Sequence, residues 1–263
     1  MRRRLFRAVS GAAEIAVTVD VDWAPDWAID LTAGILRDHG VRATWFITHA
    51  SPAVERLRQD PELFELGIHP NFLPASTQGS SPDEVLDHCL GLVPGAVTMR
   101  AHALAMSSPL LHQIAESTSI EIDVSLFCPY MPGIHPVLYA WEGRTLVRVP
   151  YFWEDDHEME LEPPRWEAER IARLPDGIKV INFHPIHVFL NSSSMDAYRR
   201  LVAAETSTEA EEAAFAEGGE GTRTFFEGLV AMLEDTESWR IRDLRERFPA
   251  RWPSRDHPLG NEP

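Results

Sequence analysis

The sequence predicts an α/β protein folded as a deformed (β/α) barrel of about seven parallel strands. Short apolar runs, mostly rich in Val and Ile, alternate along the chain with helix signals. The runs show little alternation of polar and apolar residues, as expected of strands that are covered on both faces. At 263 residues the chain is long enough to fold as one such domain, spanning residues 1–263.

We expect strands at residues 15–22, 42–48, 66–71, 97–102, 120–127, 146–153 and 179–184. Three of the helices between them begin with a serine followed by proline, which predicts N-caps at Ser51, Ser81 and Ser108. Glu84 follows Ser81 by three residues and completes a capping box. A helix beginning near Thr32 should end at Gly40.

The later segments are less regular. Residues 154–164 are acidic and interrupted by proline, and we expect a loop over the site. Residues 203–221 are rich in glutamate and end in Gly-Gly-Glu-Gly, which predicts a mobile helix-and-loop insertion. Residues 224–233 resume an amphipathic helix. The polar, proline-rich tail from Trp252 is expected to fray.

Composition excludes several classes of function. The net charge is −17 and the pI is about 5.0, so the surface repels nucleic acid phosphates. No apolar run approaches the roughly 20 residues of a membrane span. Cys89 and Cys128 form no Cys-x-x-Cys pair, which favours a reducing, cytoplasmic compartment. Residues 1–7 are basic, but Glu14 interrupts the apolar stretch after them, so we expect a short basic arm rather than a signal peptide.

Two aspartates at the end of the first strand give the sharpest chemical signal. Asp20 and Asp22 are two residues apart and would leave the same face of a strand. Such a pair is costly unless a cation or a proton separates the carboxylates, and a buried unpaired carboxylate is costly too. In parallel barrels the carboxyl ends of the strands build the active site. The alternative is a pair of solvated acids that open a turn.

Histidines end two other strands. His69 precedes Pro70 and His184 precedes Pro185, and a proline cannot donate to a sheet ladder, so each imidazole should face the rim. Imidazoles are common ligands of a metal ion held by carboxylates. The alternative is that they are capping or core histidines. His187 follows closely behind His184.

Arg100 and His102 should share one face of their strand. The arginine could hold an ionised aspartate in a bidentate contact, and the alternative is a surface salt bridge. Other polar residues at predicted strand ends are His49, Asn71, Asp123, Asp155 and Asp156. We therefore predict a metal-centred active site at one end of the barrel.

These motifs resemble the polysaccharide deacetylase (NodB-homology) family, also called carbohydrate esterase family four. Thr18-Val-Asp-Val-Asp22 is similar to the aspartate-rich first motif, and residues 35–47 are similar to the helix and strand that follow it in the family. Arg100 and the Ile181–His184 stretch resemble two later motifs. The similarity covers about residues 15–190 and points to an outlying bacterial branch.

The chain departs from the family pattern at two places. Leu73 stands where the family has a second metal histidine, four residues after His69, so a third protein ligand must come from elsewhere. His102 is the first candidate and Asn71 the second. Val21 separates two aspartates that are adjacent in the family, which leaves open which of them is base and which is ligand.

The resemblance implies a metal-dependent hydrolase of an amide bond, with an N-acetylated sugar or other saccharide as substrate. Zinc or a similar divalent ion would be held by Asp22, His69 and His102. Asp20, paired with Arg100, would act as base. His184 would act as acid, oriented by Asp155 or Asp156. Two alternatives are a hydrolase of a small cyclic amide or imide on this scaffold, and a non-catalytic domain that binds a saccharide or a partner.

Overall fold

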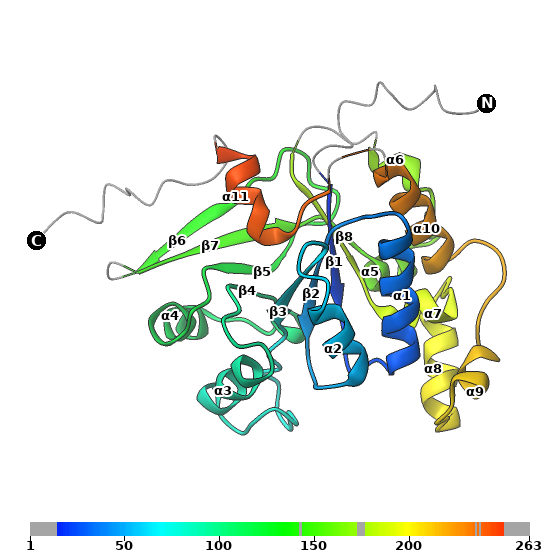
Figure 1. The fold of residues 1–263 in the computed structure, drawn as a ribbon, viewed down its shortest axis with the longest axis horizontal. Coiled ribbons are helices and arrows are strands. Elements are labelled where there is room, and N and C mark those ends of the chain that lie inside the picture. The colour runs from blue at the N-terminus through cyan, green and yellow to red at the C-terminus, as the bar shows by residue number, and fades with distance from the viewer. Residues whose placement is uncertain (1–14, 142–143, 173–176, 235, 237, 250–263) are drawn as a thin grey trace, which may run out of the picture.

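A mostly parallel sheet forms the centre of the protein (Figure 1). The computed structural model describes residues 15–249 apart from 142–143, 173–176, 235 and 237, so the predicted basic arm and tail lie outside the described residues. The strands are β1 (Ile15–Asp20), β2 (Ala43–Ile47), β3 (Phe64–Ile68), β4 (Thr98–Met99), β5 (Ile122–Phe127), β6 (Val137–Trp141), β7 (Arg144–Tyr151), β8 (Trp153–Glu154) and β9 (Lys179–Phe183). Their order in the sheet is β6-β7-β5-β4-β3-β2-β1-β9-β8.

The two ends of the parallel part of the sheet, β7 and β8, are joined along the chain, and we call this arrangement of strands the ring. β7 pairs with β5 and β8 pairs with β9, and only Phe152 separates β7 from β8 along the chain. The backbone N–H of Phe152 donates to the carbonyl of Val180 at 2.8 Å, which links this segment to β9. Counting β7 and β8 as one interrupted strand, the ring contains the seven parallel strands that the sequence predicts. The predicted α/β fold class is therefore confirmed.

The sequence did not predict β6. This strand pairs antiparallel with β7 and extends the sheet away from the ring. Its residues are largely exposed, with Val137 and Trp141 on the surface, so it carries neither the buried apolar run of a central strand nor a regular alternation. Its pairing depends on the neighbouring β7 rather than on a local signal.

Helices lie around the sheet (Figure 1), and most of them pack against its outer face. They are α1 (Asp26–Asp38), α2 (Pro52–Arg58), α3 (Pro82–Leu92), α4 (Ser108–Ser117), α5 (Asp155–Met159), α6 (Ala168–Ala172), α7 (Pro185–Leu190), α8 (Met195–Ala204), α9 (Glu209–Ala213), α10 (Thr222–Leu233) and α11 (Leu244–Arg247), with short 3₁₀ turns η2 (His102–Leu104) and η3 (Ile241–Asp243). Among the described residues, no helix has the length and apolarity needed to cross a bilayer.

Two of the three predicted N-caps are confirmed. The hydroxyls of Ser51 and Ser81 accept from the backbone of their helices. The third prediction is wrong by one residue, because Ser107 rather than Ser108 has the extended cap conformation and accepts from Leu110. The capping box at Ser81 is only half formed, because the carboxylate of Glu84 accepts from the backbone N–H of Ser80 instead.

Two segment predictions are corrected, and the structure shows part of a third. Helix α1 begins at Asp26 instead of near Thr32, with Pro25 at its N-cap, and Gly40 follows its end with a φ of 63°. Residues 154–164 are not all loop, because α5 begins directly after β8 and buries Glu158, whose carboxylate accepts from Trp153 and Arg165. Residues 203–221 do contain a short helix, α9, whose mobility stays a prediction.

Buried side chains separate into two sets on the two faces of the sheet. Alternate residues of β1 show the division, since Val17 and Val19 belong to the large cluster that packs against the helices, whereas Ala16 belongs to a smaller one. The face that carries Ala16 also carries Thr18 and Asp20, because side chains alternate along a strand. The inner face of the ring is therefore partly polar, and the predicted site lies on it.

We predict that Gly67→Ala destabilises the fold. A Cβ at this position in β3 would lie 2.6 Å from Thr98 Oγ1, 2.8 Å from the Thr98 carbonyl and 2.9 Å from Phe46 Cδ1. Overpacking of this kind costs about 1–3 kcal/mol. Equilibrium denaturation measures the loss. Gly34→Ala in α1 is the control, because nothing lies within 4 Å of its Cβ position and alanine favours a helix by about 0.5–1 kcal/mol. Equal stability of the Gly67 variant and the wild type would contradict the packing described here.

Candidate active site

The carboxyl ends of β1, β3, β4 and β9 bring ionisable side chains together. β1 and β9 are adjacent, as are β3 and β4. Six of the seven predicted site residues follow or end these strands, namely Asp20, Asp22, His69, Arg100, His102 and His184. Asp155, the seventh, follows β8, which pairs with β9. The site therefore occupies the end of the ring where parallel barrels carry their chemistry.

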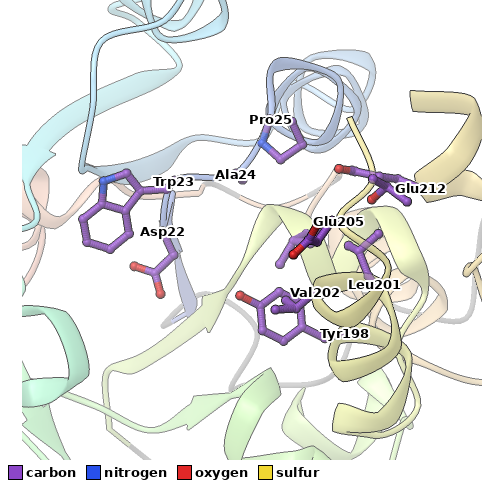
Figure 2. Close-up of a pocket in the computed structure, with 11 residues that line it drawn as sticks. Asp22, Trp23, Ala24, Pro25, Tyr198, Leu201, Val202, Glu205 and Glu212 are labelled. Carbon is purple, nitrogen blue, oxygen red and sulfur yellow. The ribbon is translucent and has the colours of Figure 1, made fainter. Parts of the chain in front are cut away.

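A tight turn, rather than the strand itself, positions Asp22. β1 ends at Asp20, two residues before the predicted end, and Asp22 and Trp23 both have left-handed backbone conformations, with φ of 43° and 55°. Such conformations cost on the order of 1 kcal/mol or more for residues other than glycine. Bonds from Trp23 N to Thr48 Oγ1 at 3.0 Å and from Ala24 N to Val21 O at 2.8 Å hold the turn. Figure 2 shows Asp22, Trp23 and Ala24 leading into α1.

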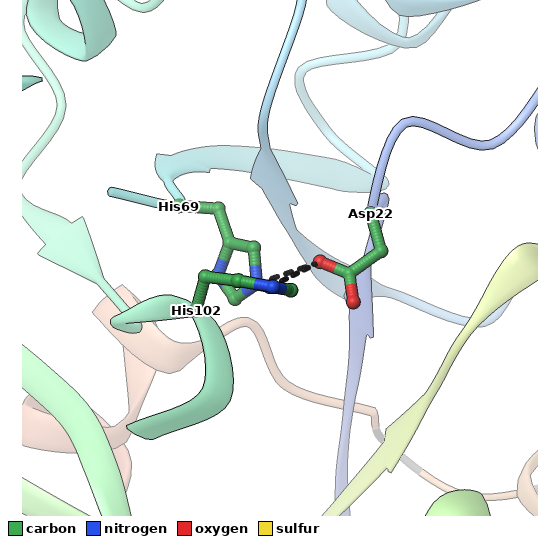
Figure 3. Close-up of side chains that lie close together, drawn as sticks. All are labelled: Asp22, His69 and His102. Carbon is green, nitrogen blue, oxygen red and sulfur yellow. Dashed lines mark hydrogen bonds and ion pairs between the residues drawn. The ribbon is translucent and has the colours of Figure 1, made fainter. Parts of the chain in front are cut away.

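Asp22, His69 and His102 meet at one carboxylate oxygen (Figure 3). Asp22 Oδ1 lies 3.0 Å from His69 Nε2 and 3.0 Å from His102 Nδ1. His69 Nδ1 lies 2.7 Å from the carbonyl oxygen of Arg100, which can only accept, so Nδ1 carries the proton in that bond. A neutral His69 would then point a lone pair at a carboxylate. A second proton or a cation must therefore lie between them.

The three side chains fit a divalent metal ion. Zinc binds imidazole nitrogen and carboxylate oxygen at about 2.0–2.2 Å, so two ligand atoms of one tetrahedral ion lie about 3.3–3.5 Å apart. Asp22 Oδ1 lies 3.0 Å from each of the two imidazole nitrogens, which is within a few tenths of an ångström of this spacing. The bond from His69 to the Arg100 carbonyl is also the kind that orients a metal-binding imidazole.

Of the two candidates for the third ligand, the structure brings only His102 to this group. The side chain of Asn71 turns away, and its Oδ1 accepts from Leu73 N at 3.0 Å. His102 does not lie on a strand as predicted, because β4 ends at Met99 and His102 begins the short turn η2. Its approach to Asp22 therefore depends on that turn.

The protonation of this group reflects competition between burial and charge. Burial disfavours the Asp22 carboxylate, but hydrogen bonds from His102 and His69 outweigh burial and hold its pKa well below the usual value. Burial also lowers the pKa of His69, but the charges of Asp20 and Asp22 and the bond to Asp22 raise it above 6.5 overall. Without a metal ion, the raised pKa of His69 favours a proton at the nitrogen that an ion would occupy.

We therefore predict that metal affinity depends on pH through His69. An ion can bind Nε2 only after its proton leaves, so affinity should fall about tenfold for each pH unit below the raised pKa of His69. Because that pKa is raised, the decline should begin at a higher pH than it would for an unperturbed imidazole. Competition with a chelator at pH 6, 7 and 8 measures it. An affinity that is equal at these three values would contradict the proposed ligand set.

Asp20 is held by two different donors. Arg100 Nη1 donates to Asp20 Oδ1 at 2.8 Å, and Asn182 Nδ2 donates to Asp20 Oδ2 at 3.0 Å. The predicted bidentate contact is wrong, because Asn182 occupies the second oxygen. The other nitrogens of Arg100 donate to Thr18 Oγ1 at 3.0 Å and to the Val124 carbonyl at 3.2 Å.

Arg100 is a buried residue and not part of a surface salt bridge. It is 1% exposed, and its guanidinium lies between the rings of Phe46 and Tyr151, at 4.8 and 4.3 Å from their centres. Asn182 Oδ1 accepts from Arg100 Nη1 and from Thr18 Oγ1. The role of Asn182 was not predicted, although a polar residue between Ile181 and Phe183 in a buried strand was a usable signal.

His184 is oriented by Asp155. Its Nδ1 lies 2.7 Å from Asp155 Oδ1, and its backbone N–H donates to Asp155 Oδ2 at 2.9 Å. The other ring nitrogen, Nε2, faces Asp22 Oδ2 at 3.6 Å and Asp20 Oδ2 at 4.0 Å. Burial lowers the pKa of His184, but the charges of Asp156 and Asp155 outweigh burial and raise it well above 6.5. A proton-carrying imidazole therefore faces the two aspartates.

Asp156 forms a second pair with His187. Its Oδ1 lies 2.9 Å from His187 Nε2 and 3.7 Å from His184 Nδ1. Of the two aspartates that the sequence offered as partners of His184, Asp155 therefore makes the direct hydrogen bond. Burial raises the pKa of Asp156, but the charge of His184 and the bond and charge of His187 lower it to about 2 overall.

Two other residues from predicted strand ends do not join the site. Asp123 lies within β5, where Arg148 Nε donates to its carboxylate at 2.7 Å. His49 Nδ1 contacts the hydroxyl of Thr48 at 3.0 Å. Tyr198 on α8, by contrast, lines a cleft beside Asp22. The sequence carried no signal that α8 would lie next to Asp22.

Comparisons with known proteins identify the family to which this fold and this group of side chains belong. Residues 17–202 match the family model described as WbmS-like polysaccharide deacetylase. The chain belongs to this polysaccharide deacetylase family, which confirms the resemblance seen in the sequence. No curated protein matches the chain.

Solved structures extend the comparison. A protein from Bordetella bronchiseptica, described as a candidate polysaccharide deacetylase involved in O-antigen biosynthesis, is 36% identical, with a TM-score of 0.72. The match covers 84% of this chain and 90% of that one. The peptidoglycan deacetylase PdaC from Bacillus subtilis is 12% identical over 93% of this chain and 95% of its own, with a TM-score of 0.46. A family 4 acetyl xylan esterase from Clostridium thermocellum is 14% identical over 89% and 91%, with a TM-score of 0.44. The last two matches carry no conclusion about function.

Proposed function

We propose that this protein is a metal-dependent hydrolase that removes an N-linked acyl group, in the first instance N-acetyl, from a sugar. The observation that carries the proposal is the contact of Asp22 Oδ1 with two imidazole nitrogens at 3.0 Å each, with His184 facing the same aspartate. Membership of the polysaccharide deacetylase family supports deacetylation as the reaction.

Asp22, His69 and His102 would hold zinc or a similar divalent ion. When bound, such an ion polarises a substrate carbonyl and lowers the pKa of a water molecule. The nitrogen and oxygen donors match the preferences of zinc, and three protein ligands leave room for water and substrate. The hydrogen bond from His69 Nδ1 to the Arg100 carbonyl orients the imidazole and supports this role.

Asp20 is the proposed general base, which takes the proton of the attacking water. Arg100 and Asn182 fix both of its oxygens, so the carboxylate needs no reorientation before the reaction. His184 is the proposed general acid. An amine leaves poorly unless it is protonated. The pKa of His184 is raised, Asp155 orients its ring, and its Nε2 lies 3.6 Å from Asp22 Oδ2.

The non-catalytic alternative is less well supported. It arose because Leu73 replaces an expected histidine, but His102 supplies a third donor from a different segment. A domain that only binds sugar has no need for the buried Asp155–His184 pair. We also propose that the protein acts in the cytoplasm on a soluble or carrier-linked sugar, since both cysteines are free.

A substrate panel tests the proposal. Protein loaded with zinc should release acetate from at least one N-acetylated sugar, and this release should stop when a chelator removes the ion. A small cyclic imide, assayed in parallel for ring opening, tests the alternative hydrolase. Ring opening without acetate release would overturn the proposed substrate class. Sugar binding with neither reaction, by protein that carries its metal, would support the non-catalytic alternative.

A further inference from the structure

A cleft of about 220 Å³ opens beside Asp22. The turn between β1 and α1 forms one wall, and residues of α8 and α9 with their connection form the other (Figure 2). Pockets for drug-sized ligands begin at about 300 Å³, so this cleft has room for roughly one sugar residue rather than a length of polymer. Because Asp22 is both a cleft residue and a proposed metal ligand, a sugar in the cleft would lie next to the reacting group.

The cleft combines an aromatic ring with an apolar wall. The Tyr198 ring packs edge-on against His187, with centroids 5.3 Å apart, and Leu201 and Val202 continue the wall. Figure 2 shows the Tyr198 hydroxyl directed toward Asp22. A tyrosine offers an apolar ring face and a polar tip, which suits a sugar ring with its hydroxyl groups.

The charges that line the cleft have one sign. Besides Asp22, the lining includes Glu205 and Glu212, and none of the described lining residues is basic. Trp27 Nε1 donates to Glu212 Oε2 at 2.9 Å and holds this carboxylate at the cleft. Glu205 follows α8 in a left-handed conformation with a φ of 49°. Even with a divalent ion at Asp22, the outer part of the cleft stays negative.

We propose that this cleft binds the acylated sugar and selects uncharged sugars against sugars that carry a phosphate or a carboxylate. This inference rests on the proposed function and adds the charge class of its substrate. Glu205 and Glu212 repel an anionic group at the distances that a single sugar ring spans. The deacetylated product carries an ammonium group, which the same carboxylates attract.

Two sugars with the same acyl group test the selectivity. Methyl N-acetylglucosaminide and N-acetylglucosamine 6-phosphate differ in charge, and we expect kcat/KM to be at least about tenfold lower for the phosphate at low ionic strength. The difference should shrink in 0.5 M salt, where charges are screened over a few ångströms. Glu205→Gln should reduce the ratio of the two kcat/KM values by on the order of fivefold. Glu209→Gln is the matched control, because Glu209 is an exposed residue of α9 outside the cleft lining.

Binding provides a readout that does not depend on turnover. In titrations followed by NMR on chelator-treated protein, the affinity should be highest for methyl glucosaminide, lower for the uncharged acetylated sugar and lowest for the phosphate. Glu205→Gln should make these differences in affinity smaller. Equal binding of the three sugars, or a preference that Glu205→Gln leaves unchanged, would overturn the inference. Selective binding without deacetylation of either sugar would support the cleft and count against the proposed function.

Discussion

Asp20→Asn is expected to abolish turnover while the protein keeps its metal ion. The amide can still accept from Arg100 but cannot take a proton from water, and loss of a general base costs on the order of 10²–10⁴ in rate. Asp20 makes its hydrogen bonds to Arg100 and Asn182, whereas Asp22 makes the short contacts with His69 and His102. Steady-state kinetics combined with metal analysis of the same preparation measures both effects.

Asp22→Asn is the matched control for this experiment, because it removes the same charge two residues away. This variant should lose affinity for the metal itself. If Asp20→Asn lost the metal and Asp22→Asn kept it, the two roles would have to be exchanged. If both variants lost the metal, both aspartates would be ligands and the base would lie elsewhere.

His184→Ala should separate amide from ester hydrolysis. An amide substrate needs a proton on the departing nitrogen, so we expect a loss on the order of 100-fold or more in turnover. An activated acetate ester has a good leaving group and should lose far less. Both substrates are assayed on one preparation whose metal content is known. Equal losses on both, or loss of the metal, would show that His184 is a ligand or a structural residue.

Asp155→Asn gives a graded comparison with His184→Ala. The charges of Asp156 and Asp155 raise the pKa of His184, so this acid stays protonated above the pH range in which an ordinary imidazole loses its proton. The rate of amide hydrolysis should therefore fall only as the pH rises through the raised pKa of His184. Removing the Asp155 charge lowers the pKa of His184, and the fall should move to lower pH. An unchanged pH profile would remove Asp155 from the proposed role.

The strands and the position of the site could be predicted because their signals are local. A buried parallel strand such as β9 is a continuous apolar run, and Pro185 marks where it ends. The side chain that follows such a run reaches the rim of the ring wherever the neighbouring strands lie. His69 and His184 were found in this way.

The contacts between segments could not be predicted from local signals. Asp22 reaches the histidines through a left-handed turn that the hydroxyl of Thr48 stabilises, and His102 reaches Asp22 from a 3₁₀ turn. Asn182 meets Asp20 only because β9 pairs beside β1. The choice of Asp155 over Asp156 depends on which carboxylate α5 turns toward His184. Each of these depends on the assembled fold.

Metal content measured on protein purified without a chelator tests the central claim most directly. The wild-type protein should carry about one equivalent of a divalent ion, and His102→Ala should carry much less while keeping its fold, because the His102 side chain is 24% exposed and its loss opens no buried cavity. Circular dichroism of the variant checks the fold. Less than about a tenth of an equivalent in the wild type, or wild-type occupancy in His102→Ala, would contradict a metal centre built from Asp22, His69 and His102.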